Sequence, residues 1–220
     1  MKGLYRFLMS ATILLCGGLS ANAAVITFDD LLSGITTYGF DGDGDTVNDV
    51  IFSTVDPAGY NTTGPGPNMS YIDEPGLEGS TIYDLRVDFL RQAQDYLNFG
   101  FALDDFSETL NTWTEFWVYD SGGNLLAHDF EYGLYTLPDG VNASSFPEGR
   151  IETTFAGIAS YALFDFNNDA SGGQRYIIDN FEGTFGSTEV PPVGIPAPGA
   201  VVLCAIGSGL VGWLRRRKRM

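Results

Sequence analysis

The chain has 220 residues, with 28 acidic and 11 basic side chains, two cysteines and one histidine, and seven of the bases lie at its two ends. The stretch 24–190 therefore carries all 28 carboxylates and only four arginines, a net charge of −24, which excludes nucleic acids as partners and favours cations. Because Cys16 and Cys204 fall in the terminal apolar segments, the central stretch has no thiol for disulfides, thiolate zinc sites or thiol catalysis.

Residues 1–23 are typical of a signal peptide. A short basic start precedes an apolar run over residues 7–19, and a small-x-small sequence ends at Ala23. We expect signal peptidase to cleave before Ala24. The alternative is an uncleaved anchor helix, but the apolar run is shorter than the roughly 20 residues that a bilayer span needs.

Residues 24–188 alternate apolar and polar side chains over short runs that Gly, Pro, Asn and Asp clusters separate, the pattern of an all-β domain. Nine short runs favour a two-sheet β-sandwich. The charged face of residues 84–88 predicts an outer strand with one wet face, whereas the nearly all-apolar run 161–166 predicts a more central strand. We expect strands over residues 25–31, 50–54, 82–90, 96–102, 113–119, 125–130, 151–155, 160–166 and 175–185.

Within this domain, an acidic loop offers oxygen ligands at alternate positions. Glycines bend the backbone between the acids, so that three or four oxygens can converge on one hard cation such as calcium. The loop resembles calcium loops of the Asp-x-Asp-x-Asp type, although Thr46 and Phe52 replace the glycine and the glutamate of a full EF-hand. The alternative is a solvated acidic turn. The predicted ligands of a structural Ca²⁺ are Asp41, Asp43, Asp45, Asn48 and Asp49.

The predicted strand 113–119 is rich in aromatic residues. Trp117 and Tyr119 share one face, and Phe116 and Val118 share the other. We expect one face to fill the core. For Trp117 and Tyr119, stacking on sugar rings and packing in the core both stay open.

The C-terminal end predicts a membrane anchor. Residues 189–198 form a proline-rich linker, residues 199–214 an apolar segment just long enough to span a membrane, and residues 215–220 a basic tail that stays in the cytoplasm. The domain before the linker is then on the far side of the membrane. A buried core helix would not end in five consecutive cations.

This arrangement of linker, short helix and arginine cluster resembles the PEP-CTERM sorting signal of exopolysaccharide-producing Gram-negative bacteria. The resemblance covers about the last 30 residues. It implies that an exosortase recognises the element Pro196-Ala197-Pro198, in which Ala197 replaces the family's glutamate, together with the cluster Arg215, Arg216 and Arg217, and removes the tail. The mature protein would then belong to the envelope surface or the exterior.

The sequences at the two ends of the domain, 26–31 and 176–182, resemble the first and last strands of the jelly-roll, lectin-like or carbohydrate-binding-module-like domains often found ahead of this signal. The resemblance implies that these strands pair and that a structural calcium lies nearby. Only one side of each strand can face a shared ion, and capping of a paired edge is the alternative role. The second candidate set is Asp29, Asp30, Asp179, Asn180 and Glu182.

Together these features predict an exported, non-catalytic, calcium-stabilised carbohydrate-binding-like module, with signal peptidase, exosortase and extracellular polysaccharide as partners. A purely structural matrix or biofilm protein without glycan affinity is the alternative. A third possibility is a glycoside hydrolase with two carboxylates, but among 28 acids some pair lies at a suitable distance by chance. With His128 as the one histidine, few other acid–base groups are available.

Overall fold

The computed structural model describes residues 22–62, 64, 69–104, 112–135, 146–166 and 174–185. All regular elements in these ranges are β-strands with antiparallel pairing, which confirms the all-β prediction. The described part of the chain holds no helix long and apolar enough to cross a membrane. The predicted signal peptide up to residue 21, and the linker, anchor and tail predicted over residues 189–220, lie outside the described residues.

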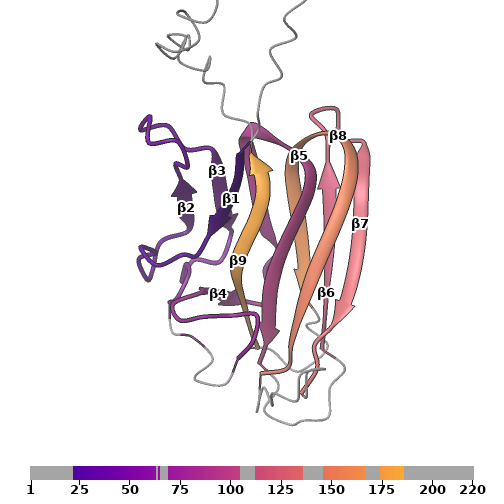
Figure 1. Ribbon diagram of the computed structural model, residues 1–220. Coiled ribbons are helices and arrows are strands. Elements are labelled where there is room, and N and C mark those ends of the chain that lie inside the picture. Colours follow the sequence, from indigo (N-terminus) through magenta and orange to yellow (C-terminus); the bar gives the residue numbers. More distant parts are fainter. Residues whose placement is uncertain are drawn as a thin grey trace, which may run out of the picture.

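Two long strands form the centre of the sheet, and seven shorter strands flank them (Figure 1). The long strands have 19 residues each and run side by side as a curved pair. In chain order the strands are β1 (Asn22–Ile26), β2 (Thr37–Phe40), β3 (Val50–Thr54), β4 (Leu77–Ser80), β5 (Leu85–Leu103), β6 (Trp113–Tyr119), β7 (Leu125–Tyr132), β8 (Glu148–Phe166) and β9 (Arg175–Phe185).

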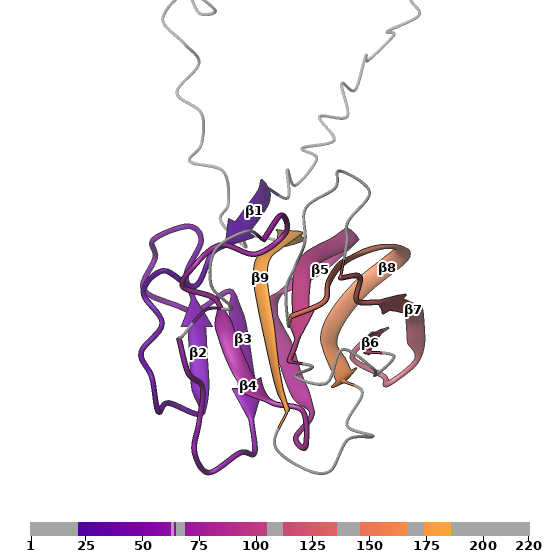
Figure 2. The same cartoon turned by 90° about the horizontal axis from the view of Figure 1, so that it is seen from below.

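The curvature of β5 and β8 divides the sheet into two layers. Residues 85–89 of β5 pair with β3, and residues 85–88 pair with the end of β8, which also pairs with β6. From Ala93 onward, β5 instead lies between β9 and the beginning of β8. The first layer thus contains β2, β3, β6 and β7, and the second contains β1, β4 and β9. Figure 2 shows β2 and β7 on opposite sides of the molecule, with β9 between them.

A local change of backbone conformation turns each long strand from one layer into the other. In β5 the register shifts between Asp88 and Ala93, and Gln92 and Asp95 have positive φ angles of 64° and 66°. In β8, Gly157 has a φ of 110°, a conformation that costs glycine little because it has no Cβ. Bulges of this kind bend a strand and increase its twist.

Aromatic side chains fill the space between the layers. The rings of Phe52 on β3 and Phe181 on β9 meet edge to face at 5.2 Å, and Phe99 on β5 contacts Phe116 on β6 at 5.0 Å. Phe52, Phe99, Phe116 and Phe181 are all 0% exposed. In β6 alternate residues therefore face this core and the outside, whereas residues 99–103 of β5 and 176–179 of β9 are buried on both faces.

The described sheet corrects the predicted topology. It is one continuous hydrogen-bonded sheet folded into two layers, because β5 joins the predicted strands 82–90 and 96–102, and β8 joins 151–155 and 160–166. The segment 85–88 has the predicted wet face but lies between β3 and β8, so it is not an outer strand. The central position of 161–166 is confirmed. Strands β2 and β4, each four residues long, were not predicted.

Candidate functional site

Strand β6 presents alternate residues to the core and to the outside. Phe116 and Val118 are fully buried, whereas Trp117 and Tyr119 are partly exposed on the opposite face. The predicted division of this strand is therefore confirmed, and Trp117 and Tyr119 lie on the outer face of the first layer.

Neighbouring strands extend this aromatic surface. The ring of Trp117 lies parallel to His128 of β7, with centroids 5.3 Å apart and an angle of 7° between the planes. Tyr119 stacks on Tyr161 of β8 at 4.9 Å and 15°. The guanidinium carbon of Arg86 lies 4.2 Å from the centroid of Tyr161. We call Trp117, Tyr119, His128 and Tyr161 the aromatic platform.

Carboxylates lie beside the platform. Glu115 Oε1 is 3.8 Å from His128 Nε2, and Asp165 faces Glu115 across the β6–β8 pairing. Burial raises the pKa of Asp165, and the negative charges of Asp84 and Glu115 raise it further. Flat rings beside hydrogen-bonding groups are the features that bind the apolar faces and the hydroxyls of a sugar.

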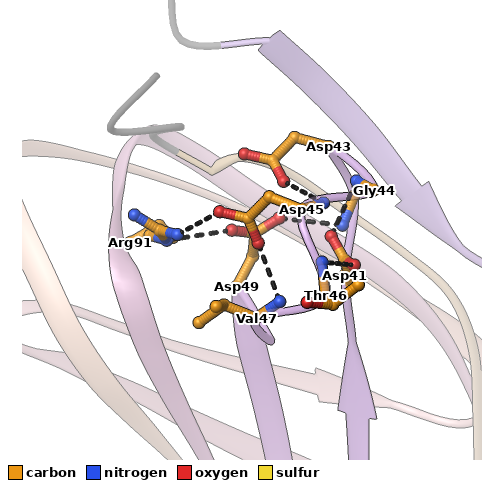
Figure 3. A network of polar contacts seen from close by, with 9 residues as sticks. Asp41, Asp43, Gly44, Asp45, Thr46, Val47, Asp49 and Arg91 are labelled. Carbon is orange, nitrogen blue, oxygen red and sulfur yellow. Dashed lines mark hydrogen bonds and ion pairs between the residues drawn. The ribbon is translucent and has the colours of Figure 1, made fainter. Parts of the chain in front are cut away.

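The acidic loop lies between β2 and β3, and backbone N–H groups already hold its carboxylates (Figure 3). Asp41 accepts hydrogen bonds from the N–H groups of Gly44 at 2.7 Å and Thr46 at 2.8 Å. Desolvation opposes the ionisation of Asp41, but these donors outweigh it and lower its pKa. Asp43 likewise accepts from the N–H of Asp45 at 3.1 Å. These contacts explain the tight turn of the loop.

Three of the five predicted calcium ligands converge. Each of Asp41, Asp43 and Asp49 offers one carboxylate oxygen, and these oxygens lie within 4.8 Å of one another. Burial raises the pKa of Asp49, which is 5% exposed, and the charges of Asp43 and Asp41 raise it further. Oδ2 of Asp43 is buried without a hydrogen-bond partner among the described residues, whereas Oδ1 of Asp49 is buried and lies 3.5 Å from Nε of Arg91. This trio is the part of the loop that could hold a cation.

The other two predicted ligands have different surroundings. Asp45 accepts from a guanidinium nitrogen of Arg91 at 2.6 Å, and the Nε of Arg91 lies 3.5 Å from Asp49 (Figure 3). The side chain of Asn48 lies over Gly39 of β2, where a Cβ would come within 2.2 Å of it. Arg91 therefore supplies an internal positive charge at the edge of the trio.

The second candidate set is not brought together as a ligand group. Asp29 accepts from Thr27, and Asp30 accepts from the hydroxyl of Tyr38. The Asp179 carboxylate is 1% exposed and accepts from the N–H groups of Asp73 and Asn180. In the described part of the chain, the trio in the acidic loop is the one group of three acidic, histidine or cysteine residues close enough to hold an ion.

The first and last described strands do pair, but not over the predicted segments 26–31 and 176–182: β1 ends at Ile26, which lies opposite Phe181, and residues 27–31 follow the strand. Ala24 of β1 lies opposite Gly183 of β9, and Ala23 lies opposite Thr184. The predicted cleavage before Ala24 would leave Ala24 to Ile26 available for this pairing. The predicted sorting residues Pro196 to Pro198 and Arg215 to Arg217 lie outside the described residues.

The sequence did not point to the partners of these sites. Tyr161 and His128 complete the platform, but only the pairing of β6 with β8 and β7 shows that they lie beside Tyr119 and Trp117. Arg91 is 46 residues from Asp45 along the chain. The nearly all-apolar run 161–166 gave no sign that Tyr161 faces outward.

Comparison with known proteins found no matching family model and no matching curated protein. Among solved structures, a cleaved adhesin domain of Lys-gingipain from Porphyromonas gingivalis is 12% identical, with 73% of this chain and 98% of that chain covered and a TM-score of 0.40. A family 29 carbohydrate-binding module is 10% identical, with 79% and 100% covered and a TM-score of 0.35. A carbohydrate-binding module specific for non-crystalline cellulose is 13% identical, with 52% and 77% covered and a TM-score of 0.33. At these scores, none of them establishes the function of this chain.

The buried carboxyl of Asp179 predicts a pH-dependent stability. Burial raises its pKa from 3.8 to about 7, and the charges of Asp73 and Asp29 contribute, although two N–H donors oppose the shift. The folded state then retains a proton that the unfolded state loses between about pH 4 and 7. The free energy of unfolding should therefore fall over this window, by at most about 1.4 kcal/mol per pH unit from this group, and level off above it.

The measurement is urea unfolding of the wild type and Asp179→Asn between pH 4 and 8. The wild type should lose stability relative to the variant as the pH rises to 7. Asp120→Asn is the control: hydrogen bonds from Asn124 lower the pKa of Asp120, so this carboxyl is ionised in both states over most of the range and its difference from the wild type should stay nearly constant. A constant difference between wild type and Asp179→Asn would contradict the prediction.

Proposed function

We propose that this chain is a non-catalytic carbohydrate-binding module. The observation that carries the proposal is the aromatic platform, in which Trp117 and Tyr119 turn away from a complete core and stack on His128 and Tyr161. Large rings at the surface of a sheet leave apolar area in water, and the C–H faces of sugar rings cover such area. Phenylalanine side chains fill the core between the layers, so Trp117 and Tyr119 have no packing role there. This supports a binding role for the two rings.

Charge narrows the class of glycan. Because the stretch 24–190 has a net charge of −24, it disfavours strongly anionic polysaccharides at low ionic strength. Arg86 is itself engaged by Asp88, with a nitrogen–oxygen distance of 2.6 Å. We therefore favour neutral polysaccharides as ligands.

The platform can be tested by affinity electrophoresis of the purified full chain in gels that contain hydroxyethylcellulose, glucomannan or xylan. The wild type should be retarded by at least one of them. Trp117→Ala and Tyr119→Ala should each weaken binding about tenfold, a loss of about 1.4 kcal/mol that is typical of one aromatic contact.

Tyr83→Ala is the matched control, because Tyr83 is a partly exposed tyrosine outside the stacked pairs. It should bind like the wild type. Equal retardation of the wild type and both platform variants, or no retardation in any gel, would contradict sugar binding by the platform. The second result would favour the structural matrix protein.

We also propose that the trio Asp41, Asp43 and Asp49 binds a structural Ca²⁺. Supporting this are the short separation of the three carboxylates and the buried Oδ2 of Asp43, which has no hydrogen-bond donor among the described residues. Oxygen ligands suit a hard cation. The ion would link the end of β2 to the beginning of β3, and its charge would offset the burial and the repulsion that raise the pKa of Asp49.

Calcium should raise the melting temperature of the full chain relative to a chelator at equal ionic strength. At 100 times the dissociation constant, the ion adds about 2.7 kcal/mol, or roughly 5–10 °C for a domain of this size. Asp43→Asn, which keeps an oxygen for the N–H of Asp45, should reduce the shift. Asp120→Asn, at an acid that also accepts backbone N–H groups in another turn, should not. An unchanged wild-type midpoint would contradict a calcium site.

The localisation proposed from the sequence is export, followed by retention at the envelope or release. The signal-peptide and sorting-signal patterns support it, and β1 is compatible with cleavage because Ala24 to Ile26 pair with Gly183 to Phe181. Protein recovered from envelope and medium fractions should begin at Ala24 when its N-terminus is sequenced. Full-length chain recovered from the cytosol alone would contradict export.

A further inference from the structure

A groove lies on the outer face of the second layer, in a different layer from the aromatic platform. Its floor is formed by outward residues of β5, β8 and β9, and Val25 of β1 forms one side. The segment 70–71 forms another part of the wall. The volume is about 290 Å³, close to the lower end of the roughly 300–1,000 Å³ of small-molecule sites. A ligand of one or two rings would fit this space.

Hydrogen bonds hold the polar floor in place. Glu182 accepts from the hydroxyl of Tyr96 at 2.8 Å and from the amide nitrogen of Asn98 at 3.1 Å. Asn180 donates to the backbone carbonyl of Tyr71 at 3.2 Å. Because the amide nitrogen of Asn98 donates to Glu182, the amide oxygen of Asn98 points away from that carboxylate. Side chains fixed before binding lose little entropy when a ligand arrives.

Close packing on a glycine positions the wall. A Cβ at Gly100 would lie 2.1 Å from the backbone oxygen of Tyr71, so segment 70–71 can lie against β5 only because residue 100 has no side chain. Glu148 anchors the same segment by accepting from the N–H of Ser70 at 2.6 Å and of Tyr71 at 3.2 Å. The wall is therefore part of the folded structure.

The lining selects a neutral, hydroxyl-rich ligand. It combines a carboxylate, two amides and a guanidinium, from Glu182, Asn98, Asn180 and Arg150, so that donors and acceptors alternate over a small area. Arg150 opposes a cation. The domain's net negative charge and Glu182 oppose an anion. Vicinal hydroxyls of a sugar both donate and accept, which matches this lining.

We propose that this groove is a second saccharide-binding site, which takes one or two neutral sugar residues and acts independently of the aromatic platform. Glu182 accepts from ligand hydroxyls, and Arg150 donates to them from the opposite strand of the floor. Because the two sites lie on different layers, one chain can hold two polysaccharide strands.

The test is a titration of the isotope-labelled full chain with cellobiose, mannobiose and lactose, followed by ¹H–¹⁵N correlation spectra. At least one disaccharide should give saturable shifts at Asn98, Gly100, Arg150 and Glu182. Asn98→Ala and Arg150→Ala should each weaken this binding about fivefold or more and leave shifts of the Trp117 indole unchanged. The spectra also report whether each variant is folded.

Thr154→Ala is the matched control, because Thr154 is exposed on the same face of β8 but does not line the groove. It should bind like the wild type. Shifts confined to Trp117 and Tyr119 would overturn the groove proposal and leave the platform standing. No shifts at either site would overturn the groove, and unchanged affinity in folded Asn98→Ala and Arg150→Ala would do the same.

Discussion

The ring of Phe181 lies between the two layers of the sheet. Its contacts help to determine which residues of each layer face outward. It meets Phe52 at 5.2 Å, Phe99 at 5.9 Å and Phe164 at 6.4 Å, so one side chain of β9 touches β3, β5 and β8. Burying a side chain of this size contributes roughly 1.5–3 kcal/mol. Since the described strands contain no cysteine, such contacts, and not disulfides, hold the two layers together.

Because side chains alternate along a strand, fixing the inward set also fixes the outward set. Phe164 in the core places Tyr161 and Asp165 on the outer face of the first layer, beside Tyr119 and Glu115. In the second layer, Phe99 in the core places Asn98 and Gly100 outward. The platform and the groove are thus two consequences of one core.

The local pattern of the sequence was enough to predict the all-β class, the bounds of β3, β6 and β9, and the division of β6 into a face with Trp117 and Tyr119 and a face with Phe116 and Val118. It could not predict that β5 and β8 continue through their bends. Gln92 and Asp95 interrupt the alternation of apolar and polar residues, which indicates the end of a strand, but both adopt positive φ angles within β5. It also missed the contact of Arg91 with Asp45, which depends on the pairing of β3 with β5. The register between strands that are far apart in the chain cannot be deduced from any one segment.

Excess negative charge constrains both proposed sites. All four arginines of the domain already contact carboxylates: Arg86 pairs with Asp88, Arg91 with Asp45 and Asp49, Arg150 with Glu152, and Arg175 with Glu78 and Asp104. The remaining acids must be stabilised by water, backbone N–H groups or ions. In the acidic loop, N–H groups and Arg91 hold the fold, but three carboxylate oxygens still lie within 4.8 Å of one another. A divalent ion would relieve that repulsion more strongly than one guanidinium at its edge. The same shortage of positive charge makes hydroxyls better ligands than anions for the outer faces.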